Sequence, residues 1–193
     1  SRGLGDVYKR QIYILEKTTM QNLLYTSDVF RGSRYGEGHP LDMDRVWPSV
    51  ELIKMMGWID DKQIVKHGPA NIEELIKFHD VNYVLALKEA EEKQSLPQEI
   101  KIKYNIGVGN NPIFKEVFSR PSTAAKASIA AIESIATKNT KRILNISGGT
   151  HHGRKSQAYG FCFLNDCVLS IFKAIELGFK KILYVDIDAH HCD

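Results

Sequence analysis

The chain has too few cysteines for a disulfide-stabilised secreted protein. Its 193 residues include three, at Cys162, Cys167 and Cys192. Three is an odd number for a disulfide framework, and the spacing forms no CxxC pair of the kind found in redox motifs and structural zinc sites. The cysteine pattern is that of a protein in a reducing environment. We therefore expect a cytoplasmic protein.

Long apolar runs are also missing. No stretch approaches the ~20 apolar residues of a membrane-spanning helix. Glu16 and Lys17 interrupt the only apolar segment near the start that could resemble a signal peptide. Residues 1–11 show glycine and scattered charge without periodicity, and we interpret them as a leader or cloning scar. The remainder contains no repeat or Pro/Gly-rich linker, which predicts a single domain.

Neither sign of charge is in large excess. The chain has 26 Lys+Arg and 23 Asp+Glu, a formal net charge of +3. Residues 1–11 hold three of the basic residues and one of the acidic, so the rest has 23 and 22, a net charge of +1. Such a balance gives no electrostatic reason to expect nucleic acid or a membrane surface as a partner. With 43% hydrophobic and 25% charged residues, the composition is that of a globular protein.

The second half of the chain shows a strand–helix–strand pattern. Short apolar runs at 141–146 and 181–185 predict two strands. Between them, Asn165 and Asp166 can cap a helix over 167–177, which Gly178 ends. Parallel strands covered on both faces are apolar throughout, as these runs are. The pattern predicts an α/β fold with a parallel sheet flanked by helices.

The first half is predicted to be mostly helical. Further elements expected from capping residues and periodicity are a strand at 22–25, a helix from 44 to 57, helices capped by Asn71 and Asp80, a glycine-rich loop at 104–112 and a helix at 123–136.

Acidic residues and histidines follow the run at 181–185. If the chain stays extended there, Asp186, Asp188 and His190 point to the same side, because strand side chains alternate. A carboxylate oxygen and an imidazole nitrogen suit zinc at ~2.0–2.2 Å. An acidic cluster beside apolar residues is costly without a cation. The pattern favours a metal site over the alternative of ordinary polar groups at a strand end.

A second histidine pair, His151 and His152, follows the run at 141–146 and two glycines. Ligands bind at the carboxyl ends of parallel strands, so both histidine pairs are expected at the same edge of the sheet. A neutral imidazole beside a bound water is a suitable general base. Two solvent-facing loop histidines are the alternative for this segment taken alone.

These segments together resemble the zinc-dependent histone deacetylase family, whose bacterial members include acetoin-utilisation and acetylpolyamine deacetylases. The motifs are YGEGHP at 35–40 followed by Arg45, FHD at 78–80 followed by Tyr83, GGTHH at 148–152, GFCFLND at 160–166 and YVDIDAHH at 184–191. The similarity runs from about residue 25 to residue 193. It implies an arginase/deacetylase-like fold, with residues 12–193 as the N-terminal part of a single deacetylase domain whose C-terminal part is missing.

The resemblance implies a catalytic zinc ion held in part by Asp188 and His190. It further implies a structural potassium ion at Asp186 and the backbone carbonyls near residues 188 and 190. Zinc lowers the pKa of a bound water towards ~7, which permits attack on an amide carbonyl at neutral pH.

The resemblance implies different roles for the two histidines of the pair at 151–152. His152 would be the general base and His151 its electrostatic partner. Asp186 would orient His151, and Asp193 would orient His152, each through the far ring nitrogen, which fixes tautomer and ring orientation.

The substrate expected from the resemblance is an acetylated lysine, an acetylated polyamine or another small acetyl-amide. Gly160 and Phe161 would line a narrow tunnel for its alkyl chain. Arg45 and Cys162 would lie near a cavity through which acetate leaves. Asn110 occupies the loop position where many members place a substrate-orienting Asp.

Besides Asn110, the chain departs from the family in two further places. Cys192 stands where the family has glycine in its HHGDG segment, and the third zinc ligand, an Asp, and a transition-state Tyr would lie beyond Asp193. We therefore expect this chain alone to be inactive. Two alternatives stay open: a dimanganese ureohydrolase of arginase type, whose D-x-H-x-D run would end at Cys192, and a non-catalytic deacetylase-like binding module.

Overall fold

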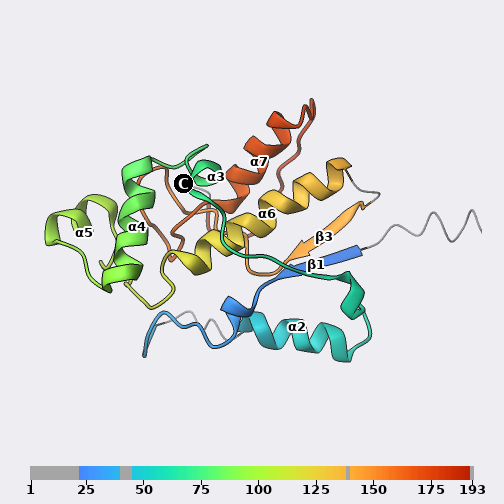
Figure 1. The fold of residues 1–193 in the computed structure, drawn as a ribbon, viewed down its shortest axis with the longest axis horizontal. Helices are drawn as coiled ribbons and strands as arrows, with labels where there is room; N and C mark the ends of the chain where they lie inside the picture. Colours follow the sequence, from blue (N-terminus) through green and yellow to red (C-terminus); the bar gives the residue numbers. More distant parts are fainter. Residues whose placement is uncertain (1–21, 40–44, 138–139, 192–193) are drawn as a thin grey trace, which may run out of the picture.

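The computed structural model describes residues 22–39, 45–137 and 140–191. In this part of the chain, helices surround a parallel three-stranded sheet of order β2-β1-β3 (Figure 1). The elements are β1 (Asn22–Thr26), η1 (Asp28–Phe30), α2 (Val46–Met55), η3 (Asp61–Gln63), β2 (Ile64–Lys66), α3 (Ile72–Leu75), α4 (Val81–Lys93), α5 (Gln98–Tyr104), α6 (Ser119–Thr137), β3 (Arg142–Asn145) and α7 (Asp166–Glu176).

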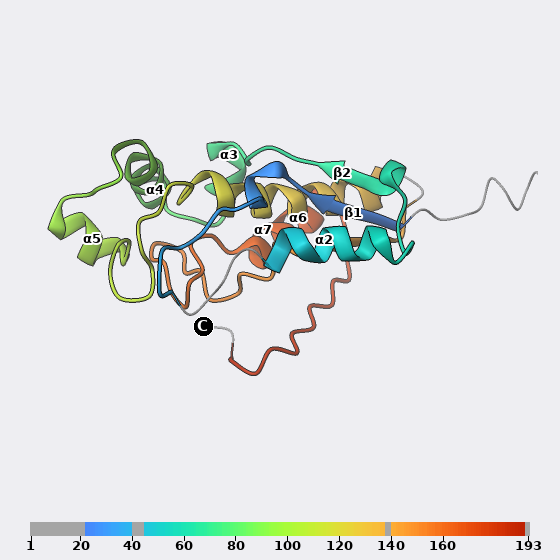
Figure 2. The ribbon, with the colours of Figure 1, turned by 90° about the horizontal axis from the view of Figure 1, so that it is seen from below.

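β1 is the central strand and is buried on both faces. Leu24 pairs with Ile64 of β2 and with Leu144 of β3. Leu23 and Tyr25 pack on α6, whereas α2 lies on the opposite side of the strands (Figures 1 and 2). Helices on both faces explain the continuous apolar character of this strand. The predicted α/β class is confirmed.

The predicted helix caps are present. Asn71 and Glu74 form a reciprocal capping box at α3. The Asp80 carboxylate accepts two backbone N–H bonds in the first turn of α4, and the Asn165 side chain accepts one at α7. Each cap satisfies amides that have no partner within the helix. The N-termini of α3, α4 and α7 are therefore set by the local sequence.

Other elements were not predicted. α5 immediately precedes the expected glycine-rich loop, and β2 lies in a stretch with no predicted structure. α6 begins at Ser119, four residues earlier than predicted, because Glu91 of α4 accepts the amide hydrogens of Phe118 and Ser119 at 2.8 and 2.7 Å. This cap comes from a distant helix, so local sequence does not reveal it.

The predicted strand at 181–185 is wrong. The chain after α7 runs away from the sheet without regular structure (Figure 2). Leu183, Val185 and Ile187 are 87%, 68% and 94% exposed. A strand needs a hydrogen-bonded neighbour, and no strand of the described residues lies beside this segment. An apolar sequence of strand type is therefore left unpaired.

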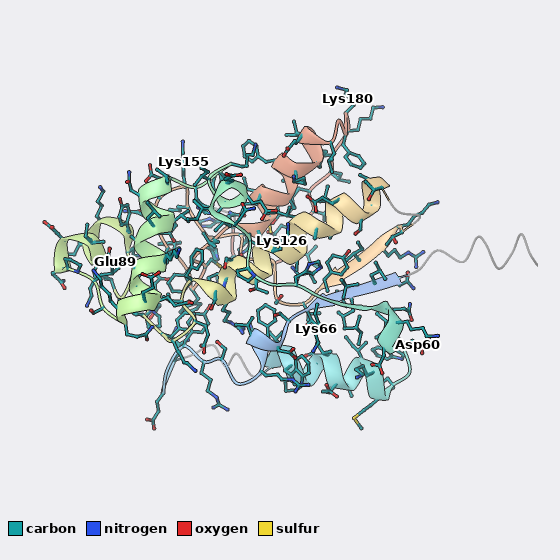
Figure 3. All side chains as sticks on the ribbon, in the orientation of Figure 1. Asp60, Lys66, Glu89, Lys126, Lys155 and Lys180 are labelled. Carbon is teal, nitrogen blue, oxygen red and sulfur yellow. The ribbon has the colours of Figure 1, made fainter. Side chains whose placement is uncertain are left out.

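The largest core cluster fills the space between α4, α6 and the loop that leads into α7. Tyr83 of α4 is fully buried and donates a hydrogen bond to the Phe163 carbonyl. On the flank, Lys126 of α6, labelled in Figure 3, forms an ion pair with Glu74 of α3. None of the helices in the described ranges combines the length and the apolarity needed to cross a membrane. The division at residue 11 lies outside the described residues and stays a prediction.

Candidate active site

The loop that carries the first histidine pair is fastened to the start of α7. Asp166 is 3% exposed, and its carboxylate accepts the backbone N–H groups of Gly149 and Thr150 at 3.1 and 2.7 Å. It also accepts the hydroxyls of Thr150 and Ser128, both at 2.6 Å. A Cβ atom at Gly148 would lie 2.4 Å from the same carboxylate, so glycine is needed for this close approach. The loop is therefore held from beneath by one buried acid.

A second anchor holds the same loop from the other side. The Asn165 side-chain amide donates to the carbonyls of His151 and Gly153 at 2.9 and 3.0 Å. His79 accepts the Asn165 backbone N–H at Nε2 (3.0 Å), and its Nδ1 donates to the Arg154 carbonyl (3.0 Å). Burial lowers the pKa of His79 to about 4, which favours the neutral ring that these bonds require. Both anchors were missed as site residues. The sequence indicated Asn165 and Asp166 as helix caps, and His79 only as part of a family motif.

His151 and His152 lie side by side, with ring centroids 4.1 Å apart. His151 is 7% exposed, and its Nδ1 lies 2.6 Å from Oδ2 of Asp186. The contact that the resemblance implied is thus present, whereas the catalytic role of the pair stays a prediction. Asp193, the implied partner of His152, lies outside the described residues.

Asp188 and His190 interact with each other. His190 Nδ1 lies 2.9 Å from Oδ1 of Asp188, and the same oxygen accepts the His190 backbone N–H at 2.8 Å. Their side chains are 51% and 77% exposed. The His190 ring centroid is 5.9 Å from that of His152, so both histidine pairs do meet at one place. Within the described ranges, however, no cluster of three or more metal-ligating side chains is formed.

Gly160 and Phe161 form a strained wall beside the histidines. Both have a positive φ, +53° and +65°, and a Cβ at Gly160 would lie 2.6 Å from the His152 ring. Left-handed backbone is unfavourable for a side chain such as that of Phe161. Tyr35 donates to the Phe161 carbonyl at 2.9 Å, and Asn111 accepts the Phe161 N–H at 3.1 Å. No sequence motif indicated a role for Asn111, and its neighbour Asn110 exposes its side chain at the pocket instead.

Cys162 is 8% exposed, and burial raises the pKa of its thiol to about 11. The thiol donates to the Gly160 carbonyl at 3.4 Å. A protonated, buried thiol is a poor nucleophile. This agrees with a packing role.

One pocket of about 900 Å³ brings the candidate residues together. It is lined by the two histidine pairs, Asp188, Gly160 and Phe161, and by residues that include Phe30, Arg45, Arg120 and Cys162. Asn110 also lines the pocket, together with the other residues of the loop at 108–111. The sequence-predicted site residues that the structure describes thus line one cavity, except Asp186, which contacts His151 from outside the lining.

The family model for the histone deacetylase domain matches residues 39–193. The chain belongs to the histone deacetylase family. It is 31% identical over 196 residues to histone deacetylase 2 of Oryza sativa subsp. japonica, covering 100% of this chain and 36% of the relative. Human histone deacetylase 1 is 31% identical over 160 residues, which cover 82% of this chain and 33% of the relative.

Solved structures of histone deacetylase homologues resemble the fold described above. A crystal structure of a homologue from Aquifex aeolicus has a TM-score of 0.83 and 38% identity, and the match covers 89% of this chain and 46% of that one. A homologue complexed with SAHA has the same TM-score and identity and covers 90% and 46%. The deacetylase-like fold is therefore shown. The chain spans about a third of these curated relatives and just under half of these solved ones.

Proposed function

We propose that this chain forms the N-terminal part of a zinc-dependent deacetylase that hydrolyses an acetyl-amide. The observation that carries the proposal is the meeting of His151, His152 and His190 at one pocket, with Asp186 bound to His151. Family membership supports hydrolytic deacetylation as the reaction class. The same membership leaves the ureohydrolase alternative without support.

The histidines would manage the proton in this reaction. His152 would take a proton from the attacking water and return it to the leaving amine. The buried His151, with its Nδ1 bound to Asp186, would stabilise the charge that develops on the neighbouring ring. A positioned base or acid contributes typically ~10²–10⁴-fold to a rate. The anchors at Asp166 and Asn165 keep the pair in place, so little reorganisation is needed during the reaction.

The described residues fit part of a zinc site. Asp188 and His190 are the donor types that zinc prefers, but catalytic zinc takes three protein ligands. The hydrogen bond between them also means that the pair must rearrange to bind a metal ion. When bound, zinc polarises a carbonyl and activates water. A structural potassium ion at Asp186 is a further proposal, supported only by the family resemblance.

The wall at Gly160 and Phe161 would guide the substrate. An aromatic ring beside a glycine backbone suits the alkyl chain of acetyl-lysine or of an acetylated polyamine. We propose both acetylated lysine and small acetyl-amides as substrates, because the wall would contact only the alkyl chain and would not distinguish between them.

The source DNA beyond codon 193 provides the first test. An open frame that encodes a further Asp ligand and a Tyr in a glycine-rich loop supports the deacetylase proposal. A stop codon instead favours the non-catalytic binding module.

Two variants of the protein encoded by this longer reading frame then separate the role of a general base from that of a zinc ligand. His152→Ala should abolish turnover of an acetyl-lysine peptide and retain zinc, measured by metal analysis. Asp188→Ala should lose the zinc itself. Equal metal loss in both variants contradicts these roles. Urea release with manganese would instead establish the ureohydrolase alternative.

A further inference from the structure

Tyr184 binds the same carboxylate oxygen as His151. Its hydroxyl donates to Oδ2 of Asp186 at 2.5 Å, and Nδ1 of His151 lies 2.6 Å from that oxygen. The other oxygen, Oδ1, accepts the backbone N–H of Asp188 at 3.0 Å. Partial burial and the bond to Asp186 raise the pKa of the Tyr184 hydroxyl, which therefore keeps its proton and donates it. The Asp186 carboxylate is thus held by a tyrosine, a histidine and its own backbone.

Apolar packing does not fix the direction of this carboxylate. The segment that carries it has no strand partner among the described residues. Val185 and Ile187, on either side of Asp186, are 68% and 94% exposed. The Asp186 side chain is nevertheless only 21% exposed and faces His151. Polar contacts therefore determine how Asp186 meets the histidine, and Tyr184 supplies one of them.

Tyr184 is itself in contact with α7. Burial raises the pKa of the Cys167 thiol, in the first turn of this helix, to about 12, and a hydrogen bond with Tyr184 acts in the opposite direction. The preceding residue of the helix, Asp166, fastens the loop that carries His151. Two consecutive residues of α7 therefore reach both partners of the contact between His151 and Asp186. One acts through the histidine loop, and the other acts through Tyr184.

We propose that Tyr184 is a positioning residue for the histidine pair, because its hydroxyl fixes the Asp186 carboxylate against His151. Hydrogen bonds from a hydroxyl to a carboxylate are among the stronger ones in proteins. This bond fixes which oxygen faces the His151 ring. It also stabilises the ionised carboxylate, so the shared proton stays on Nδ1 of His151. The ring of His152, 4.1 Å away, then has a neighbour of fixed tautomer and orientation. The value of this arrangement for catalysis rests on the proposed function.

Tyr184→Phe removes the hydroxyl and retains the aromatic ring. In ¹H–¹⁵N spectra of the chain, the signal of the Nδ1-bound proton of His151 should move downfield, because Oδ2 of Asp186 then has one donor fewer and binds the remaining one more strongly. Exchange of this proton with solvent should become about fivefold faster, the factor that corresponds to the loss of one ordinary hydrogen bond. A role of Tyr184 in packing alone predicts no change, since the ring remains.

Tyr159→Phe is the matched control. Tyr159 and Tyr184 are similarly exposed, at 42% and 44%. The Tyr159 ring also lies beside the histidine pair, with its centroid 6.1 Å from that of His152. Within the described residues, however, the Tyr159 hydroxyl forms no hydrogen bond with Asp186. The position of the His151 signal and its exchange rate should therefore stay as in the wild type.

A double-mutant comparison gives a second readout by urea unfolding. Tyr184→Phe should lower the stability of the wild-type chain, because one hydrogen bond is lost. The same substitution should have no further effect in Asp186→Ala, where the acceptor is already absent. Equal losses in the two backgrounds would show that the Tyr184 hydroxyl does not act through Asp186.

An unchanged or upfield His151 signal in Tyr184→Phe overturns the proposal, as does an equal shift in Tyr159→Phe. Neither result involves catalysis. Lack of deacetylase activity in the longer protein, together with the expected shift in Tyr184→Phe, would defeat the proposed function and leave the positioning of Asp186 by Tyr184 standing.

Discussion

Nδ1 of His151 lies 2.6 Å from Oδ2 of Asp186, across 35 residues of sequence. The histidine belongs to a loop fastened to α7, whereas the aspartate belongs to the unpaired segment that follows this helix. The contact therefore links a rigid loop to a segment without a strand partner. Tyr184 of the same segment donates to the same oxygen at 2.5 Å. The segment is positioned at the site by side-chain contacts.

Asp186→Ala should release the His151 ring. The Nδ1 donor of a buried ring then loses its acceptor, which costs about 1–3 kcal/mol. In ¹H–¹⁵N spectra the signal of the Nδ1-bound proton of His151 should disappear. Asp188→Ala is the control, because Asp188 lies on the same segment but binds His190, and it should leave the signal in place. Retention of the signal in Asp186→Ala would show that another group holds the ring.

Gly160→Ala should displace His152. The added Cβ would lie 2.6 Å from the ring. Gly109 provides a matched control, because it has the same φ of +53° and a Cβ added there would meet nothing within 4 Å. Both variants bear the same backbone strain. Any additional loss of stability in Gly160→Ala therefore reports the steric clash with His152. We expect an extra loss of about 1–3 kcal/mol in urea unfolding. Equal losses would argue against the packing of His152 on Gly160.

Asn111→Ala and Asn110→Ala should differ although the residues are neighbours. Asn111 is 4% exposed and accepts the N–H of Phe161, whereas the Asn110 side chain is exposed. Loss of a buried acceptor should cost about 1–3 kcal/mol, and an exposed substitution less than about 0.5 kcal/mol. Urea unfolding of both variants measures the difference. Phe161 resonances should shift only in Asn111→Ala, and equal effects in the two variants would contradict this arrangement.

His79 should make the stability of the chain depend on pH. Its pKa is lowered from 6.5 to about 4 by burial, so the unfolded state binds more protons between these values. The contribution of the neutral His79 ring to the free energy of unfolding is complete above the pKa of the unfolded state, near 6.5. It falls as the pH drops and is lost below about 4. A shift of this size corresponds to about 3 kcal/mol.

His79→Gln removes this titrating group. Urea unfolding at about pH 7 and at about pH 4.5 should show a large difference between wild type and variant at the higher pH and a smaller one at the lower pH. Parallel stability profiles for the two proteins would mean that other groups cause the acid sensitivity.

The helix caps and the strands β1 and β3 could be predicted from the sequence because their signals are local. Asn71, Asp80 and Asn165 each bind amides within three residues of themselves, and the alternation of short apolar runs with capped helices identified the fold class. The two histidine pairs could also be expected together, since both follow apolar runs of strand type.

The sequence by itself determined the residue types of the site, the family motifs and the helix starts, since each depends on neighbours along the chain. Only the tertiary structure decided that residues 181–185 form no strand, because strand formation depends on a distant hydrogen-bonding partner. It alone placed His79 behind the histidine loop and held Phe161 between Tyr35 and Asn111. It also buried the Nη1 atom of Arg120, which has no hydrogen-bond partner among the described residues. Burial and long-range hydrogen bonds are properties of packing, and no local pattern encodes them.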